Sequence, residues 1–326
     1  MNFDISSCNP FQIDSEEQFN EVALKIFHFQ KANNEIYGRF AETISDVAPT
    51  HYTEIPFLPI TFFKSHQVVA AKGPFDLEFR SSGTTGDNSY HFVKDASIYE
   101  ESFGRAIKMG YPDIEERAIL AVLPNYVEQG SSSLVYMVDK LIGQSKHPKS
   151  GFYLNEPGQL ARLIVELDNN NESSLLIGVS YALLDIVEQY NFQLKHAVIM
   201  ETGGMKGRRK EMIRSELHAI LEQGFGVKRI HSEYGMTELL SQAYSQGGAR
   251  FTTPAWMKVL VRDVNDPLKI LPSVKSGGIN IIDLANVYSC SFIATQDLGR
   301  SHLDGSFEVI GRFDNSDLRG CNLMVI

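Results

Sequence analysis

Two features of this 326-residue sequence predict a layered α/β fold with a β-rich C-terminal part. Between about residues 95 and 250, apolar runs without polar alternation are separated by segments of helical periodicity. Uninterrupted apolar runs are typical of strands buried on both faces, and their alternation with helices indicates a sheet layered between helices. Beyond about residue 250, short strand-like segments are separated by Gly, Asp and Pro, and little helical periodicity remains.

The N-terminal and central elements are predicted as follows. Ser15 and Gln18 form a capping box, so a helix is expected to begin there. Its apolar residues recur at i, i+3, i+4, i+7 and i+8, namely Phe19, Val22, Ala23, Ile26 and Phe27. Strands are expected at Ala118–Leu123, Leu175–Val179, Ala197–Met200 and, as a short one, Arg229–His231.

Two further helices are expected around Leu160–Leu167 and Ile213–Leu221, the second ending at Gly224 as a left-handed cap. The C-terminal strands are predicted at Met257–Val261, Gly278–Ile282, Ser291–Thr295 and Phe307–Ile310. The sequence has no internal repeat and no clear flexible linker. We therefore expect one domain, residues 1–326, with an α/β part at about 1–250 and a β-rich part at about 251–326.

The composition excludes several classes of protein. With 43% apolar and 21% charged residues, the chain is neither disordered nor fibrous. Its three cysteines, Cys8, Cys290 and Cys321, are too few and too far apart for a disulfide scaffold or a cysteine-rich zinc module. No secretory signal opens the chain, and the uncharged run at 284–296 is too short to span a membrane. We expect a cytoplasmic protein.

The charge distribution argues against nucleic-acid binding. The formal net charge is −10, whereas nucleic-acid affinity depends on clustered basic residues. One basic island is present, formed by Lys206, Arg208, Arg209, Lys210 and Arg214. It would suit a small anionic ligand, or it could be the solvated start of a helix.

A Ser/Thr/Gly-rich segment is the strongest local indication of function. It includes Ser82, Gly83, Thr84, Thr85 and Gly86. Its glycines permit tight turns, and its hydroxyl and N–H groups could surround one anion. It lacks the lysine of a Walker loop, and strand-like segments at Leu77–Arg80 and Tyr90–Val93 flank it, which predicts a hairpin around a phosphate. The alternative is an ordinary surface turn.

Three further motifs follow in the order Ser232–Glu238, Thr295–Arg300 and Gly311–Asn315. With the Ser/Thr/Gly segment, they resemble the phosphate loop, the YGMTE, the TGDLG and the hinge motifs of the adenylate-forming (ANL) superfamily. The resemblance is closer to the LuxE-type acyl-protein synthetases. It includes Pro56–Pro59, Phe62–His66, Thr202–Arg208 and Arg319–Met324, and spans about residues 55–326.

This resemblance implies that ATP activates a carboxylic acid as acyl-AMP, with Mg²⁺ as the cofactor. The Ser/Thr/Gly segment would hold the β- and γ-phosphates, Thr237 the α-phosphate and Glu238 the Mg²⁺. The adenine would lie against Tyr234 and the glycines Gly203, Gly204 and Gly235. Asp297 would bind the ribose, and Arg312 the ribose or a phosphate. The alternatives are a turn residue for Asp297, a helix-start acid for Glu238 and core packing for Tyr234.

The chain departs from the superfamily pattern in two ways. It ends soon after the hinge motif, so we expect the mobile small domain and its catalytic lysine to be absent. Lys206 and Arg208 are the candidates to supply the missing cation. In addition, Gln296 replaces a glycine of the ribose motif, and Asn315 replaces an aspartate of the hinge motif.

The resemblance also suggests where the acyl group goes. Acyl-protein synthetases transfer it to a cysteine near the C-terminus, and Cys321 has that place. Its alternative is a small buried side chain. A fatty acid is the expected substrate, with His66, Asn125 and Tyr126 as candidate acyl-binding residues. An acyl reductase or a carrier protein would be the partner.

Three other functions stay open on the sequence alone. The first is an acyl- or aryl-CoA ligase or acyltransferase that passes acyl-AMP to CoA or another carrier. The second is a non-catalytic nucleotide-binding protein. The third is a serine hydrolase with Ser180 as the nucleophile, since Ser180 sits between a strand and a helix pattern, and Asp283 and His302 follow in triad order.

Overall fold

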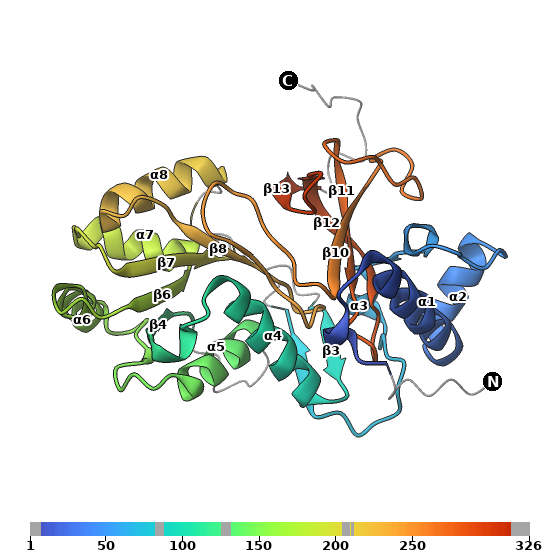
Figure 1. Cartoon of the computed structure of the whole chain (residues 1–326), viewed down its shortest axis with the longest axis horizontal. Coiled ribbons are helices and arrows are strands. Elements are labelled where there is room, and N and C mark those ends of the chain that lie inside the picture. Colours follow the sequence, from blue (N-terminus) through green and yellow to red (C-terminus); the bar gives the residue numbers. More distant parts are fainter. Residues whose placement is uncertain (1–7, 82–87, 125–131, 204–208, 210–211, 314–326) are drawn as a thin grey trace.

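The computed structural model describes residues 8–81, 88–124, 132–203, 209 and 212–313. A six-stranded sheet with the order β5-β4-β6-β7-β8-β9 forms one half of the molecule (Figure 1). Five strands are parallel: β4 (Ala118–Val122), β5 (Gly151–Phe152), β6 (Ser174–Val179), β7 (Ala197–Thr202) and β8 (His231–Tyr234). The edge strand β9 (Ala243–Ser245) is antiparallel to β8. The three predicted apolar strands are confirmed.

Helices cover both faces of this sheet. Helices α4 (Ala96–Gly110) and α5 (Ser133–Gln144) pack together on one face, and α7 (Ser180–Gln189) and α8 (Arg214–Phe225) pack together on the other (Figure 1). Helix α6 (Pro157–Asn169) connects β5 to β6. The strand order reverses between β4 and β6, and open α/β sheets bind ligands beyond the carboxyl ends of strands at such a reversal.

A second, five-stranded sheet forms the other half and confirms the β-rich C-terminal part. Its strands are β1 (Leu58–Pro59), β10 (Met257–Arg262), β11 (Ser276–Asp283), β12 (Phe292–Ser301) and β13 (Phe307–Arg312). Strands β10 to β13 pair antiparallel in succession, while β1 joins β12 in parallel. Strand β12 continues past its predicted end at Thr295, so the Thr295–Arg300 motif is part of a strand.

The N-terminal helices α1 (Glu16–Asn33) and α2 (Glu35–Ile44) lie beside this second sheet (Figure 1). The predicted start of α1 is confirmed, since Ser15 Oγ accepts a hydrogen bond from Gln18 N at 3.2 Å. The buried side chain of Gln30 donates to the carbonyls of Asn286 and Val287. The first 50 residues, which carry no motif, therefore help to hold the β-rich part.

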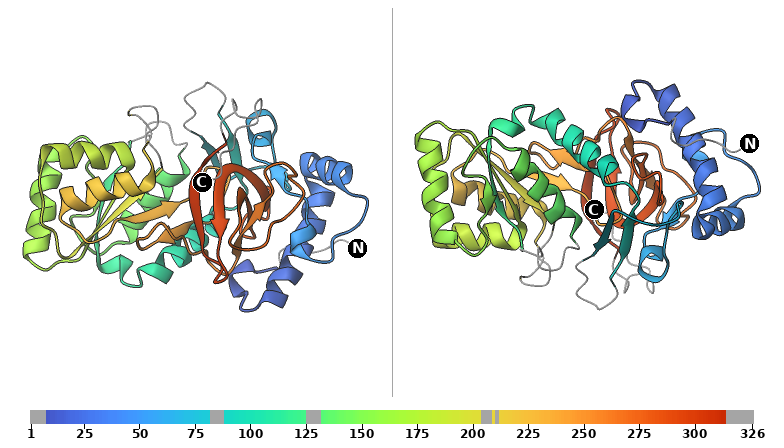
Figure 2. Two further views of the ribbon diagram at one scale, coloured as in Figure 1. Left: turned by 90° about the horizontal axis from the view of Figure 1, so that it is seen from above. Right: turned by 90° about the horizontal axis from the view of Figure 1, so that it is seen from below.

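A two-stranded hairpin lies between the two large sheets (Figure 2). Its strands β2 (Leu77–Arg80) and β3 (Tyr90–Val93) are antiparallel and match the predicted segments that flank residues 82–87. The short helix α3 (Phe62–Ser65) contacts β3. Among the described residues, no helix is both long and apolar enough to cross a membrane.

Two local predictions are wrong. Helix α8 ends two residues later than expected, because Gly226, with φ +68°, is the left-handed cap. Gly224 lies inside the helix, where a Cβ would come within 2.4 Å of the Val187 side chain. The strand expected at Arg229–His231 is instead β8, since its pairing with β7 begins at His231. The Ser232–Glu238 motif therefore begins inside the strand.

Candidate active site

Described residues of three predicted motifs, Ser232–Glu238, Thr295–Arg300 and Gly311–Asn315, come together where the two large sheets and the hairpin meet. Strand β8 ends at Tyr234, and the chain turns through Gly235 to Glu238. Strand β12 brings Asp297 to this turn, and β13 brings Arg312. The hairpin strand β3 contacts the same turn from another direction.

Tyr234, Asp297 and Arg312 form one connected group. The Tyr234 hydroxyl donates to Asp297 Oδ2 at 2.8 Å, and Arg312 Nε lies 3.2 Å from Asp297 Oδ1. Asp297 and Arg312 are also paired across β12 and β13. The Tyr234 ring is buried, with Phe251 and Phe307 at centroid distances of 5.7 and 5.4 Å. Burial and the neighbouring Asp297 charge raise the pKa of Tyr234, so its hydroxyl stays protonated and donates.

Glu238 and Thr237 form the adjoining part of the site. The Glu238 side chain is buried, and burial raises the pKa of this carboxyl. A hydrogen bond with Ser89 and the charges of Arg312 and Lys64 oppose that increase. The Thr237 side chain is partly exposed at the surface. A buried carboxyl and a partly exposed hydroxyl side chain therefore stand next to each other in this turn.

Two residues that the sequence analysis did not select hold the main chain of this turn. His91 Nδ1 lies 2.8 Å from the Thr237 carbonyl oxygen. Asn286 Nδ2 donates to the Glu238 carbonyl at 2.8 Å and to the Cys290 carbonyl at 3.0 Å. Burial lowers the pKa of His91 to about 4, so its ring is neutral near pH 7. No local sequence signal identifies His91, because its contacts with Thr237 and Asn286 are distant in the sequence.

Gly203 lies at the end of β7, beside the end of β8. Its φ of +61° lies in the left-handed region that favours glycine. Ser180 Oγ donates to the Gly203 carbonyl at 2.9 Å and lies 3.4 Å from Glu201 Oε2. Arg214 and His218 approach the other oxygen of Glu201 at 3.5 Å. The turn at Gly203 is therefore fixed by a buried polar group.

The structure does not assemble the triad of the serine hydrolase alternative, Ser180, Asp283 and His302. The Ser180 hydroxyl is engaged by the Gly203 carbonyl rather than by a histidine. Asp283 is buried and accepts hydrogen bonds from the Ser241 hydroxyl and from nearby main-chain N–H groups. His302 instead pairs with Glu308 at 2.9 Å. The three residues belong to three separate networks.

The other predicted residues lie away from this group or outside the described part of the chain. His66 is exposed at the end of α3, where its ring stacks on Phe62. Of the basic island, Arg209 pairs with Asp185 and Glu188 on α7. Cys290 is buried as expected, and burial raises its pKa to about 12. Outside the described residues lie Ser82, Gly83, Thr84, Thr85, Gly86, Asn125, Tyr126, Gly204, Lys206, Arg208 and Cys321.

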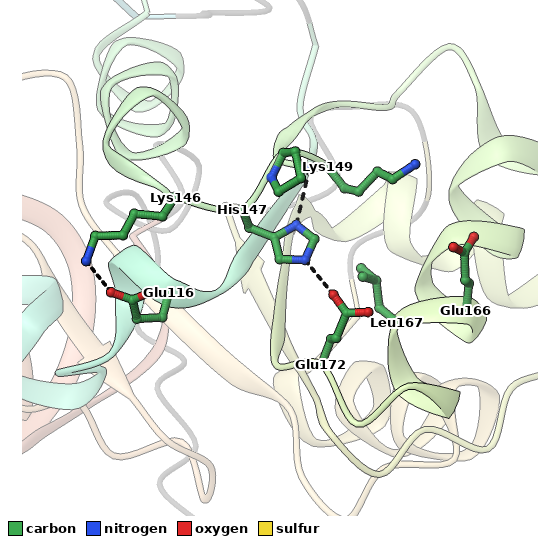
Figure 3. Close-up of a pocket in the computed structure, with 8 residues that line it drawn as sticks. Glu116, Lys146, His147, Lys149, Glu166, Leu167 and Glu172 are labelled. Carbon is green, nitrogen blue, oxygen red and sulfur yellow. Dashed lines mark hydrogen bonds and ion pairs between the residues drawn. The ribbon is translucent and has the colours of Figure 1, made fainter.

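A separate pocket opens near the amino ends of β4 and β6, where Glu116 and Glu172 lie close to the first residues of these strands (Figure 3). Lys146 pairs there with Glu116, and His147 Nε2 lies 2.8 Å from Glu172 Oε2. The converging motifs lie at the carboxyl ends of the strands, so this pocket is not the candidate site.

Comparison with known proteins assigns the fold. No family model matches the sequence, and no curated protein matches it either. Solved structures of adenylate-forming enzymes do match, and the chain has the fold of that superfamily. ATP-bound MatB from Rhodopseudomonas palustris is 18% identical over 74% of this chain and 49% of its own, with a TM-score of 0.54. The chain thus spans about half the length of the MatB structures.

Two further solved structures match at similarly low sequence identity. An open conformation of 2-hydroxyisobutyryl-CoA ligase, in complex with its acyl-AMP and CoA, is 14% identical over 92% of this chain and 75% of its own, with a TM-score of 0.66. A long-chain-fatty-acid–CoA ligase from Archaeoglobus fulgidus is 14% identical over 73% of this chain and 51% of its own, with a TM-score of 0.53.

Proposed function

We propose that this chain uses ATP to activate a carboxylic acid as acyl-AMP. The observation that carries the proposal is the convergence of Tyr234, Asp297, Arg312 and the Thr237–Glu238 turn in an adenylate-forming fold. In this reaction a carboxylate oxygen attacks the α-phosphorus of ATP. The bond from that phosphorus to the bridging oxygen breaks, and pyrophosphate leaves. Because one anion attacks another, the site must offset negative charge.

Asp297 and Arg312 are suited to the ribose. Within the described part of the chain, Tyr234 contacts one Asp297 oxygen and Arg312 the other, and a carboxylate oxygen can accept further hydrogen bonds. Its remaining lone pairs can therefore accept from ribose hydroxyls. Arg312 is 74% exposed in its side chain, and its terminal nitrogens can reach a ribose or a phosphate. We place the adenine beside Tyr234, Gly203 and Gly235.

Glu238 fits a magnesium site. Burial raises its pKa, which indicates that the cations near it do not compensate for the desolvation of its charge. Mg²⁺ is typically held by one or two carboxylates together with phosphate oxygens and water. When bound, the ion would offset charge on the phosphates, while the Thr237 hydroxyl donates to the α-phosphate.

The hairpin supports the proposed role of Ser82–Gly86 at the β- and γ-phosphates. Ser81 and Ser89 flank residues 82–87, and Ser81 N donates to the Ser89 carbonyl at 3.0 Å. Ser89 in turn is among the groups that lower the pKa of Glu238, against the effect of burial. The described residues that border 82–87 are therefore linked to the proposed magnesium ligand. Lys206 and Arg208 are our candidates for the remaining positive charge at the phosphates.

For the second step, we propose acyl transfer to Cys321, as in acyl-protein synthetases. Its thiolate would attack the acyl carbonyl carbon, a thioester would form, and AMP would leave. A fatty acid is the proposed substrate, with His66, Asn125 and Tyr126 as candidate contacts and an acyl reductase as a partner. The alternative is transfer to CoA or a carrier, which the similarity to a CoA-bound ligase favours.

The test is ATP–pyrophosphate exchange with carboxylic acids of increasing chain length, with and without Mg²⁺. We expect exchange that depends on both the acid and Mg²⁺ and that is lost in Glu238→Gln. Failure with every acid, in a protein that still binds ATP, would support a nucleotide-binding protein instead. Incubation with ATP and the best acid should then add an acyl mass that hydroxylamine removes. Equal labelling of Cys321→Ser would favour another acceptor.

A further inference from the structure

The main chain of the Thr237–Glu238 turn is held by side chains from two distant segments. His91 lies at a buried position of β3. Its Nδ1 is 2.8 Å from the Thr237 carbonyl oxygen. Asn286, from the segment after β11, contacts the Glu238 carbonyl.

The orientation of the Asn286 side chain follows from its surroundings. Two carbonyl oxygens, of Glu238 and Cys290, lie 2.8 and 3.0 Å from Nδ2, so this atom must be the amide nitrogen. The reversed amide would place its oxygen against both carbonyls without a proton between them. Asn286 Oδ1 therefore faces His91 Nε2, at 3.0 Å.

The His91 ring thus has an oxygen acceptor opposite each nitrogen. A neutral imidazole has a single N–H, so it can donate to only one of them. The contact with Thr237 is the shorter, at 2.8 Å compared with 3.0 Å. We therefore assign the proton to Nδ1. The ring is 1% exposed, so water does not readily replace this bond.

We propose that His91 is a positioning residue of the candidate active site, which acts by donating Nδ1–H to the Thr237 carbonyl. The inference rests on the proposed function. Strand β3 begins at Tyr90, and His91 on this strand contacts Thr237, the residue proposed to bind the α-phosphate. The bond therefore fixes the distance between β3 and the Thr237–Glu238 turn before ATP arrives.

Two substitutions separate the two ring nitrogens. In His91→Asn the amide nitrogen takes the place of Nδ1, and in His91→Gln it takes the place of Nε2. The control is His231→Gln, which alters a partly buried histidine whose Nδ1 lies 2.7 Å from the Tyr111 hydroxyl oxygen rather than at the turn. Hydrogen–deuterium exchange over residues 234–242 of the unliganded protein reports the turn, where Leu239 N donates to Met236 O. The KM for ATP in pyrophosphate exchange reports the site.

We expect His91→Asn to keep the protection of residues 234–242 and to raise the KM for ATP by less than about threefold. His91→Gln should lose protection there and raise that KM about tenfold, the effect of one lost buried hydrogen bond. His231→Gln should change neither. Equal effects of the two His91 variants, the reverse order, or loss of protection in His231→Gln would overturn the inference. Absence of exchange activity in the wild type would instead refute the proposed function, while deuterium exchange still tests the bond.

Discussion

The buried neutral His91 should make the protein less stable as the pH falls from about 6.5 to 4. The folded state lowers the pKa of this group from 6.5 to about 4, chiefly through burial. Between these values the unfolded chain binds more protons than the folded one, so protonation favours unfolding. The stabilising contribution is complete above about pH 6.5 and is lost towards pH 4. A difference of about 2.5 in pKa corresponds to about 3 kcal/mol.

A difference measurement is needed because another buried group acts in the opposite direction. Burial raises the pKa of Glu233 from 4.5 to about 7, so between these values the folded state binds more protons and stability increases as the pH falls. The wild-type curve alone therefore mixes the two effects. Comparison with His91→Asn cancels Glu233, since only the His91 contribution differs.

The assay is urea unfolding of the wild type and His91→Asn at intervals from pH 7 to pH 4.5. The free energy of unfolding of the wild type should fall relative to that of the variant by about 2 kcal/mol over this range, most of the roughly 3 kcal/mol limit. Parallel curves would refute the assignment of His91 as a buried neutral side chain. A wild type that gains stability relative to the variant at low pH would show that the histidine is protonated in the folded protein.

The remaining predictions concern the site and one helix end. Tyr234→Phe removes the hydrogen bond to Asp297 and should lower the free energy of unfolding by about 1 kcal/mol and raise the KM for ATP. Arg312→Ala should leave urea unfolding nearly unchanged, because the side chain is exposed, but should weaken ATP binding in calorimetry about tenfold or more. Gly226→Ala should lower the unfolding midpoint more than Gly305→Ala. Both glycines have positive φ, but only at Gly226 would a Cβ come within 2.6 Å of a carbonyl oxygen. Similar midpoints would refute the steric argument.

Local patterns were sufficient to predict most of the fold. The apolar runs predicted where strands β4, β6 and β7 lie, because a strand buried on both faces needs apolar residues throughout. The hairpin strands β2 and β3 agreed with the predicted segments. The end of α8 was misplaced because two glycines lie two residues apart, and their φ values and packing, which decide between them, are not visible in the sequence.

The site was predictable only in part for a related reason. Motif residues such as Tyr234 and Asp297 could be selected by type and order, and the structure joins them by a hydrogen bond across 63 positions. His91 could not be selected, because its contacts with Thr237 and Asn286 span 146 and 195 positions. Such contacts depend on how the hairpin packs between the two sheets, which no local pattern specifies.

The same long-range contacts determine how the site forms during folding. Asp283, at the end of β11, accepts hydrogen bonds from Leu240 N at 2.7 Å and from Ser241 N at 3.0 Å. It holds the segment that follows Glu238, whereas His91 holds the residue that precedes it. The turn between β8 and β9 is therefore fixed only when the parallel sheet, the hairpin and the C-terminal sheet are all in place. Since contacts of large sequence separation form at a high entropic cost, we infer that the candidate site is among the last parts of the molecule to be ordered.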